Sequence, residues 1–354
     1  MTGLRDRLIA RIAAEGPMTL AEYMAACLMD PDHGYYATRD PFGRGGDFIT
    51  APEISQMFGE LIGLFLAQVW IDQGRPGRFV LAEPGPGRGT LMADALRALR
   101  AVPGARDAAE VHFVETSPTL RRAQAERVPE ARWHDSVADL PEAPLFLVAN
   151  EFLDALPIRQ FRREADGWSE TVIGLREGGL TFGRGPAAAY GGLAHRLDDT
   201  RPGDIVETCP ALPAIAGEVA GRIARHGGVA LVIDYGDWRS RGDTFQAVRA
   251  HHAVDPLAEP GRADLTAHVD FEALALGLVQ GGARSSRMTP QGVFLERLGI
   301  AARAERLASA LAGQALTAHL AAHRRLTHPA EMGSLFKVLA CTPEGAAPPP
   351  GLDC

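Results

Sequence analysis

Three glycines at alternate positions, Gly85, Gly87 and Gly89, follow a short apolar segment and precede a helical one. Glycine has no Cβ and tolerates positive φ, so a turn built from it brings backbone amides close to a ligand. A strand, a glycine loop and a helix in this order are typical of sites that bind nucleotide-like cofactors. The same pattern also fits a tight turn that binds nothing, so the neighbouring acidic residues are needed to decide.

Acidic side chains stand at the ends of three successive predicted strands. Glu83 precedes the loop, where its charge would repel a pyrophosphate held at the helix N-terminus. Glu115 ends the second strand, where a carboxylate can accept both ribose hydroxyls, and Asp135 follows the third, where it can accept from an adenine amine. S-adenosylmethionine carries an ammonium, a sulfonium and an adenosine but no phosphate. We therefore expect it to be the cofactor.

Rival cofactors fit this pattern less well. The spacing is not the G-x-G-x-x-G of nicotinamide enzymes, and the loop lacks the G-K-[ST] of a phosphate-binding loop. Singly, Glu115 and Asp135 could each be an ordinary helix N-cap. The predicted cofactor-binding residues around the strand ends are Glu83, Gly85, Gly87, Gly89, Thr90, Glu115, Thr116, His134, Asp135, Ser136 and Asn150.

Strands and helices alternate through the middle of the chain as a parallel sheet requires. Short apolar runs at 79–82, 111–115, 145–149 and 229–234 predict buried strands, with a weaker strand at 131–134 and a final strand at 335–340. Helical segments at 90–100 and 118–127 separate the first of them, and a long apolar helix is expected over 54–70. This order predicts a doubly wound α/β sheet.

Segments outside this pattern predict additions to the sheet. The amino terminus is amphipathic, and Thr19 with Glu22 forms a capping box for a second helix. Alternating residues predict antiparallel hairpins around 165–167 and 177–179, and 235–270 is expected to be irregular. We divide the chain into a helical segment (1–75), a cofactor-binding core (76–157 and 228–341), a hairpin and helical insertion (158–227) and a flexible tail (342–354).

Composition excludes several classes of partner. The 354-residue chain has a net charge of −8 and no basic stripe, so we expect no nucleic acid. No apolar run is long enough to span a bilayer, so membrane insertion is not expected. The amino terminus lacks the long apolar core of an export signal, and the four cysteines form no C-x-x-C pair. We expect a cytoplasmic protein that acts on a protein or a small molecule; its oligomeric state is not indicated.

Long stretches of the sequence resemble the MidA-type methyltransferases, whose mitochondrial members are assembly factors of respiratory complex I. The resemblance runs from about residue 17 to 340 and is carried by LMDPDHGYY (28–36), GDFITAPEISQMFGE (46–60), EPGPGRGTL (83–91), ANEFLDALPIRQF (149–161), LVIDYGD (231–237) and DTFQAVRAHHAVDPL (243–257). Pro84 departs from the family, which usually has another apolar residue there. A proline removes a backbone donor at the strand end, so the loop is expected to be slightly re-set.

The resemblance implies a class I methyltransferase fold and methylation of an arginine on a subunit of complex I. It also implies that the loop containing Asp47 and Thr50 shapes the cofactor pocket. Two alternatives stay open: an assembly chaperone that binds the cofactor without essential catalysis, and a methyltransferase of small molecules.

Methyl transfer requires alignment of the acceptor, exclusion of water and handling of one proton. A protonated guanidinium is best held by carboxylates. Glu151 and Asp154 follow the fourth predicted strand, so we interpret them as catalytic, together with Glu53 at the start of a covering helix. Asp154 could instead cap a turn, and Glu53 could serve only the charge of its helix N-terminus.

Residues beyond the fifth predicted strand are expected on the substrate side. They are Asp234, Tyr235, Gln246 and His251. His319 and His323 are four residues apart on a predicted helix, which matches half of a zinc site, but no H-E-x-x-H glutamate accompanies them. We expect no metal.

Overall fold

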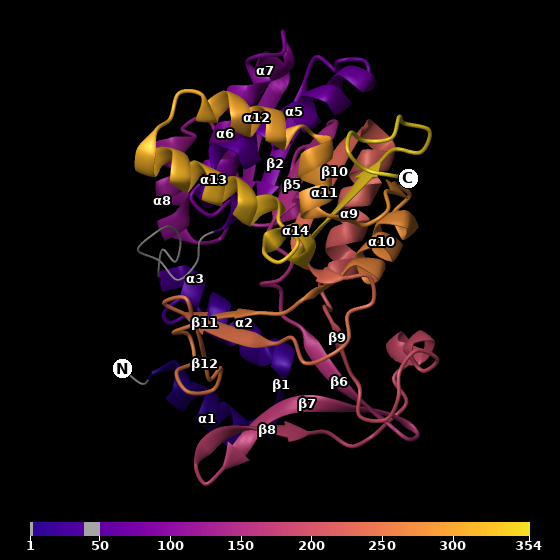
Figure 1. Cartoon of the computed structure of the whole chain (residues 1–354). Helices are drawn as coiled ribbons and strands as arrows, with labels where there is room; N and C mark the ends of the chain where they lie inside the picture. The colour runs from indigo at the N-terminus through magenta and orange to yellow at the C-terminus, as the bar shows by residue number, and fades with distance from the viewer. Residues whose placement is uncertain (1–2, 39–49) are drawn as a thin grey trace. The chain divides into compact units, whose positions relative to one another are not determined.

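The computed structural model describes residues 3–38 and 50–354, which form two compact units (Figure 1). The first unit combines Met1–Pro41, Asp154–Ala211 and Arg239–Asp270. The second combines Phe42–Leu153, Leu212–Trp238 and Phe271–Cys354. This division differs from the expected one, because the segment before residue 75 is shared between the units and the helix at 212–226 belongs with the sheet.

The sheet of the second unit has the strand order β4-β3-β2-β5-β10-β17-β15. Strands β4 to β10 are parallel, and β17 is antiparallel to β10. The bounds are β2 (Phe79–Pro84), β3 (Ala109–Val114), β4 (Arg132–His134), β5 (Leu145–Asn150), β10 (Gly228–Asp237), β15 (Arg284–Ser285) and β17 (Phe336–Thr342). The short β16 (Thr289–Pro290) also pairs with β17. The predicted doubly wound α/β sheet is therefore confirmed.

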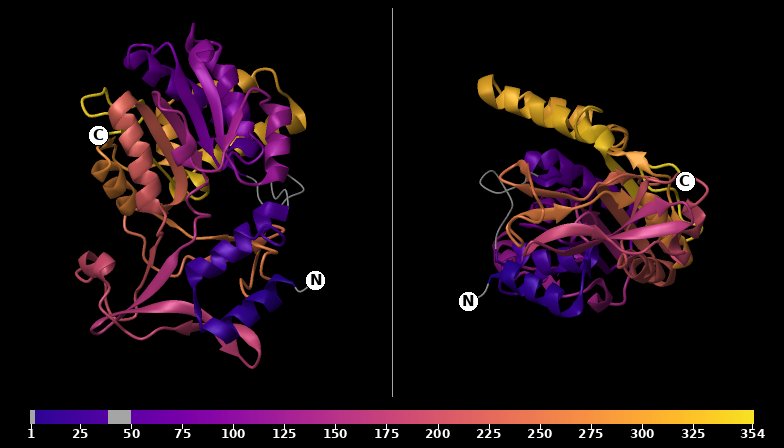
Figure 2. Two further views of the ribbon diagram at one scale, coloured as in Figure 1. Left: turned by 180° about the vertical axis from the view of Figure 1, so that it is seen from behind. Right: turned by 90° about the horizontal axis from the view of Figure 1, so that it is seen from below.

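The strand order reverses between β2 and β5. From β2 the chain adds β3 and β4 on one side, then returns to place β5 on the other side of β2. Every residue of β2 and β5 is buried, as in strands covered on both faces, and Figure 2 shows helices packed around this sheet. In sheets of this kind ligands bind at the carboxyl ends of the strands where the order reverses. The predicted acids Glu83 and Glu151 lie at that point.

Helices connect and cover the strands of this unit. They are α6 (Thr90–Leu99), α7 (Ala105–Ala108), α8 (Pro118–Arg127), α9 (Leu212–His226), α10 (Phe271–Gln280), α11 (Gln291–Arg297), α12 (Ile300–Ala308), α13 (Gly313–Thr327) and α14 (Met332–Leu335), with the short turn η1 (Val137–Asp139) after β4. The predicted helices at 90–100 and 118–127 are confirmed as α6 and α8.

The long helix predicted over 54–70 is divided at Ser55. Helix α4 (Ala51–Ile54) ends there, and α5 (Gln56–Asp72) begins with the Ser55 hydroxyl accepting from the Met57 N–H. Glycines let α5 approach α6 closely: a Cβ on Gly63 would lie 2.6 Å from the Ala95 carbonyl oxygen. This close packing holds α4 beside the first turn of α6, which begins directly after the glycine loop.

The first unit is built from short helices and antiparallel strands. Helix α1 (Leu4–Glu15) precedes α2 (Leu20–Met29), whose predicted capping box is confirmed, and α3 (Tyr35–Thr38) follows. The two predicted hairpins are confirmed by β6, β7 and β8, which pair in that order. The remaining bounds of this sheet are β1 (Met18–Thr19), β6 (Arg159–Glu164), β7 (Gly167–Arg176), β8 (Gly179–Arg184) and β9 (Ile205–Thr208), with η2 (Gly191–Arg196) between the last two.

The stretch expected to be irregular contains a small antiparallel sheet. Strands β11 (Gln246–Arg249), β12 (His252–Val254) and β13 (Asp264–Thr266) pair in the order β12-β11-β13. Ala250 and His251 both have positive φ in the turn between the first two. The prediction failed because strands of three or four residues give no alternating apolar pattern, and the turn contains none of the usual glycine or asparagine.

The carboxyl terminus is not the flexible tail that its composition predicts. Leu352 is 6% exposed and belongs to the main core cluster, and the Arg287 N–H donates to the Asp353 carbonyl oxygen at 2.7 Å. Leu352 and the contacts of Asp353 thus attach the terminus to the second unit.

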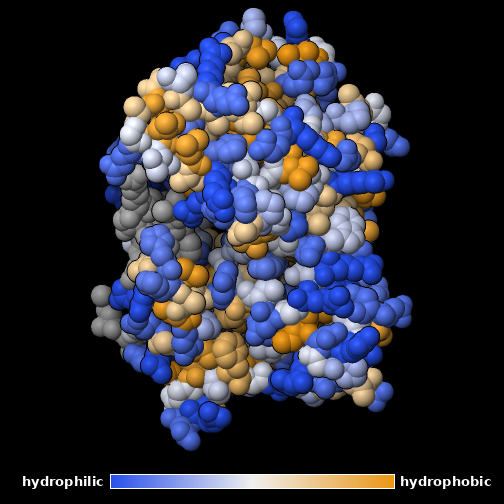
Figure 3. Space-filling model, viewed as in Figure 1, coloured by the Kyte–Doolittle hydropathy of each residue, from blue (hydrophilic) through white to orange (hydrophobic). Residues whose placement is uncertain are grey.

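Among the described residues, no helix is long and apolar enough to cross a bilayer. Hydrophilic and apolar residues are interspersed on the face shown in Figure 3.

Candidate functional site

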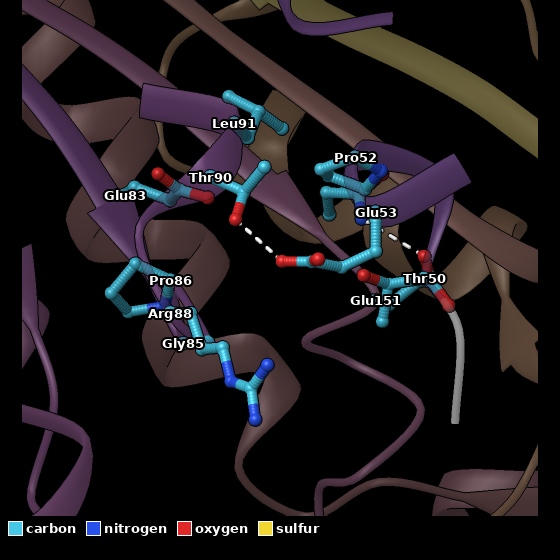
Figure 4. Close-up of a pocket in the computed structure, with 12 residues that line it drawn as sticks. Thr50, Pro52, Glu53, Glu83, Gly85, Pro86, Arg88, Thr90, Leu91 and Glu151 are labelled. Atoms are coloured by element: carbon cyan, nitrogen blue, oxygen red, sulfur yellow. Dashed lines mark hydrogen bonds between the residues drawn. The ribbon is translucent and has the colours of Figure 1, made fainter. Parts of the chain in front are cut away.

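A pocket opens at the carboxyl ends of β2 and β5, within the second unit (Figure 4). Its walls come from the glycine loop, the first turn of α6, the end of β5 and the α4 segment. The lining residues are Thr50, Pro52, Glu53, Glu83, Gly85, Pro86, Gly87, Arg88, Thr90, Leu91, Asn150 and Glu151.

The glycine loop has the conformation for which glycine is needed. Gly85, Gly87 and Gly89 have φ values of 60°, 53° and 77°. At Gly85 an added Cβ would also lie 2.9 Å from a ring carbon of Phe152. Gly85 and Gly87 line the pocket, whereas Gly89 is the N-cap of α6. The loop thus exposes backbone close to any ligand in the pocket.

Glu83 is a buried carboxylate with one unused oxygen. The side chain lines the pocket although the residue is only 3% exposed. It accepts a hydrogen bond from the backbone of Met92 in the first turn of α6, and burial raises its pKa well above the usual range for glutamate. Oε2 has no hydrogen-bond partner within the described part of the chain. A cationic ligand would supply the missing partner, whereas a phosphate would be repelled.

Asn150 adds a second unused acceptor to the same pocket. Its Nδ2 donates to Oε1 of Glu151 at 3.1 Å, which leaves Oδ1 buried and without a partner among the residues described. Glu83 and Asn150 lie at the carboxyl ends of the two strands at which the order reverses, and both residues line the same pocket. An ammonium group has three donors and no acceptor, which matches this pair. The residues therefore fit the amino-acid end of S-adenosylmethionine.

Glu151 is held in an unusual backbone conformation next to these acceptors. Its φ is 52°, a region that residues other than glycine rarely occupy, and its Oε1 also accepts from the Ala51 N–H at 3.0 Å. Such strain is concentrated at functional sites. The carboxylate lines the pocket and is anchored from both β5 and α4.

Glu53 is engaged by groups from two other helices. Its Oε1 accepts from the Thr90 hydroxyl at 2.5 Å and lies 3.7 Å from Nη1 of Arg127, which also donates to the Thr90 hydroxyl. Figure 4 shows Glu53 and Thr90 directed toward each other across the pocket. These contacts tie α4 to α6 and α8, and Thr50 lines the pocket from the same segment.

Glu115 lies outside the lining of the pocket but is connected to it. Its carboxylate accepts from the Ser117 N–H at 2.8 Å and from Nε2 of Gln124 at 3.2 Å. The same Nε2 donates to the carbonyl oxygen of Gly87, which lines the pocket. Burial raises the pKa of Glu115. The next residue, Thr116, is exposed.

The residues after the third predicted strand have local partners and do not line the pocket. Asp135 is 80% exposed in its side chain and forms an ion pair with Arg121. Ser136 caps the turn that follows, where its hydroxyl accepts from the Ala138 N–H. His134 contacts His112 through Nε2 and Nδ1, which are 2.8 Å apart. Their roles at the adenine end of a cofactor stay predictions.

This histidine pair makes the second unit sensitive to acid. His112 is completely buried, and burial together with the charge of His134 lowers the pKa of His112 from 6.5 to about 4. Between pH 4 and pH 6.5 the His112 imidazole is protonated in the unfolded chain but not in the folded chain. The free energy of unfolding is therefore highest above pH 6.5 and falls as the pH is lowered toward 4. We expect urea unfolding to show a loss on the order of 2 kcal/mol over this range that is absent from His112→Asn. If the free energy of unfolding of His112→Asn falls equally over this pH range, His112 is not the cause of the acid sensitivity.

Four predicted residues lie outside the second unit or outside the description. Asp154 is buried in the first unit near Tyr36, whose pKa is raised by burial and by the charges of Asp264 and Asp154. Gln246 and His251 are exposed on or beside β11 in the same unit. Asp47 lies outside the described residues. The structure therefore does not bring Asp154, Gln246 or His251 into the lining of this pocket.

Asp234 and Tyr235 have structural contacts in the second unit. Asp234 is completely buried and accepts from the Leu153 N–H at 3.0 Å and from the Tyr235 N–H at 2.9 Å. The Tyr235 ring packs edge-on against Phe336. Asp234 thereby fixes the loop after β5 that carries Glu151. Neither residue lines the pocket, so an expected contact with substrate stays a prediction.

Sequence patterns missed Gln124 and the pocket residues Pro52, Pro86, Arg88 and Leu91. A lone glutamine in a helix carries no motif. Pro86 and Arg88 lie within the glycine loop and Leu91 lies just after it, so the loop motif could have indicated these three. His319 bonds to the Ala304 carbonyl oxygen at 2.9 Å. In the described ranges, no group of three His, Cys, Asp or Glu side chains could hold a metal ion.

Comparison with known proteins shows the family to which the chain is similar. Residues 61–288 match the model of a family of S-adenosyl-L-methionine-dependent methyltransferases. The chain is 37% identical to a protein arginine methyltransferase NDUFAF7 homolog, mitochondrial, of Drosophila melanogaster, with 96% of this chain and 85% of that protein covered. It is 36% identical to protein arginine methyltransferase NDUFAF7, mitochondrial, of Homo sapiens, with 97% and 84% covered.

A solved structure supports the same fold and cofactor. A protein from Burkholderia thailandensis, crystallised with S-adenosyl-homocysteine bound, superposes with a TM-score of 0.84 at 31% identity. The match covers 98% of this chain and 93% of that one.

The predicted cytoplasmic location is wrong by this comparison, because both curated relatives are mitochondrial by name. An amphipathic pattern distinguishes a helix from the apolar core of an export signal. It does not distinguish one compartment from another, which is why the prediction failed.

Proposed function

Because the chain belongs to a family of S-adenosylmethionine-dependent methyltransferases, we propose that it methylates an arginine side chain of a protein. The names of its mitochondrial relatives support an arginine acceptor. The observation that carries the proposal is the acidic pocket at the strand reversal, where Glu83 and Asn150 have unused acceptors beside the strained Glu151.

We assign the cofactor-binding roles by chemistry. Glu83 and Asn150 would hold the ammonium group, and Gly85 and Gly87 allow close approach to the backbone. Glu115 would accept the ribose hydroxyls. The bound cofactor supplies an activated methyl group on its sulfonium. This cofactor carries no phosphate, in keeping with the buried carboxylate of Glu83, which accepts from the Met92 backbone in the first turn of α6.

Glu151 and Glu53 are proposed to act on the acceptor. A guanidinium is protonated under ordinary conditions, and carboxylates can hold it so that one nitrogen is oriented for attack. Glu151 is fixed by the Ala51 N–H and by Asn150, so its carboxylate is held in a defined position in the pocket. Glu53 is fixed by Thr90, which makes it the second candidate for this contact.

The proposed protein substrate is a subunit of respiratory complex I, methylated during assembly. This step rests on the sequence resemblance to the MidA-type methyltransferases. Mass spectrometry of complex I subunits from a deletion strain should reveal one arginine that has lost its methyl groups. Expression of the wild-type chain should restore them, and a variant that lacks the Glu151 charge should not.

Two results would change this assignment. Unchanged arginine methylation in the deletion strain would exclude the complex I substrate but leave the cofactor assignment intact. Normal complex I assembly with the catalytically inactive variant would favour the alternative of an assembly chaperone.

A further inference from the structure

Gln124 is a buried amide that joins three separate parts of the second unit. It lies in α8 and is 0% exposed. Its Nε2 donates to the Gly87 carbonyl oxygen at 2.8 Å and to Oε2 of Glu115 at 3.2 Å, and its Oε1 accepts from Nε1 of Trp133 at 2.8 Å. Both of its N–H groups and its oxygen are therefore used.

The chemistry of the partners fixes the orientation of this amide. The indole N–H of Trp133 is a donor only, so the amide oxygen of Gln124 must face it. The amide nitrogen then faces a carbonyl and a carboxylate, and a carbonyl and an ionised carboxylate are acceptors only. A flipped amide would place its N–H groups against the Trp133 N–H and its oxygen against the Gly87 carbonyl and the Glu115 carboxylate. Each buried hydrogen bond lost in this way would destabilise the fold.

The two acceptors belong to the two parts of the proposed cofactor site. Gly87 is in the loop that lines the pocket beside Glu83 and Asn150. Glu115 directly follows β3, and its other oxygen accepts from the Ser117 N–H. One planar amide thus sets the separation between the loop and this carboxylate.

We propose that Gln124 is a positioning residue that holds the glycine loop and Glu115 at the separation that S-adenosylmethionine requires. The proposal rests on the assigned role of Glu115 in binding the ribose. Among side chains of similar length, glutamate cannot supply two N–H donors, and methionine supplies none. We therefore expect Gln124 to affect the affinity for the cofactor more than the rate of methyl transfer.

Two substitutions at this position separate the donor role from mere packing. Gln124→Met keeps the length of the side chain but removes both donors, so S-adenosylhomocysteine should bind about tenfold more weakly at pH 8 and at pH 6. Gln124→Glu places a second carboxylate against Glu115, so binding should weaken by about 30-fold or more at pH 8. Part of this loss should be recovered at pH 6, because the paired carboxylates then share a proton.

Isothermal titration calorimetry of the full chain with S-adenosylhomocysteine tests the proposal. Gln160→Met is the matched control: Gln160 is a buried amide in the first unit that also donates to two carboxylates, those of Glu207 and Asp243. Gln160→Met should bind S-adenosylhomocysteine with the affinity of the wild type. In turnover, Gln124→Met should raise KM for S-adenosylmethionine and leave kcat within a few-fold of the wild type.

Trp133→Phe provides a second test if the substitutions at Gln124 prevent folding. It keeps the aromatic ring and removes the donor that orients the amide, so binding should weaken by about three- to fivefold. Wild-type affinity in folded Gln124 variants, or an equal loss in Gln160→Met, would overturn the proposal. If the wild type binds S-adenosylhomocysteine but methylates no arginine, the proposed substrate fails and the role of Gln124 stands.

Discussion

Replacing Glu83 with glutamine is expected to weaken the binding of S-adenosylhomocysteine by about 100-fold. The substitution keeps the size of the side chain and the acceptor for the Met92 backbone but removes the charge that we assign to the ammonium group. A buried carboxylate with an unused oxygen is costly in the absence of ligand, so the free energy of unfolding of Glu83→Gln should be unchanged or higher. Calorimetry and urea unfolding measure the two effects.

The pH dependence of binding provides an independent check of the same residue. Burial raises the pKa of Glu83, so at lower pH the carboxylate is protonated and cannot pair with an ammonium. Affinity should therefore rise as the pH increases, with release of a proton on binding, and this rise should be smaller in Glu83→Gln.

A matched control distinguishes a specific role of Glu83 in binding from the effect of removing any buried carboxylate. Glu207 is a buried glutamate of the first unit whose pKa is also raised by burial, and it accepts from Thr244 and Gln160. Glu207→Gln should bind S-adenosylhomocysteine like the wild type. If both variants lose affinity equally, Glu83 has no specific role.

Replacing Glu151 with glutamine is expected to lower kcat for arginine methylation by about 100- to 1000-fold. The amide oxygen can still accept from the Ala51 N–H, so the strained backbone is retained while the negative charge is lost. The affinity for S-adenosylhomocysteine should stay within a few-fold of the wild type, because the ammonium is assigned to Glu83 and Asn150. Radiolabelled methyl transfer to the substrate protein measures the rate.

Glu130→Gln is the control for this loss of charge, since Glu130 pairs with Arg106 at the surface. Its kcat should equal that of the wild type. Full activity of Glu151→Gln would exclude the carboxylate from the reaction. A parallel loss of cofactor binding would instead reassign Glu151 to the cofactor site.

The fold could be predicted where the sequence pattern reflects burial on both faces of a sheet. The mostly apolar runs predicted at 79–82, 111–115 and 145–149 became β2, β3 and β5 with nearly the expected bounds. The stretch around His251 could not be predicted in the same way, because its strands are short and paired with each other. The attachment of the carboxyl terminus depends on the burial of Leu352 and on contacts of Asp353 with Arg287 and Arg297, which no periodicity reveals.

The site could be predicted only in part, because position at a strand end does not determine where a side chain points. Glu83, Asn150 and Glu151 line one pocket, since their strands are neighbours at the reversal of strand order. Asp135 also follows a strand, but Arg121 pairs with it at the surface. Asp234 lies within β10, and its carboxylate accepts from the Leu153 backbone N–H. Such partners come from tertiary packing, which spacing alone does not encode.

The binding of 5′-methylthioadenosine, compared with that of S-adenosylhomocysteine, tests most directly whether Glu83 selects the ammonium end of the cofactor. The first ligand has the adenosine and the sulfur but no amino-acid group. We expect the wild-type chain to prefer S-adenosylhomocysteine by about 100-fold and Glu83→Gln to lose most of that preference. Equal affinities for the two ligands in the wild type, or a preference that Glu83→Gln retains in full, would contradict the assignment.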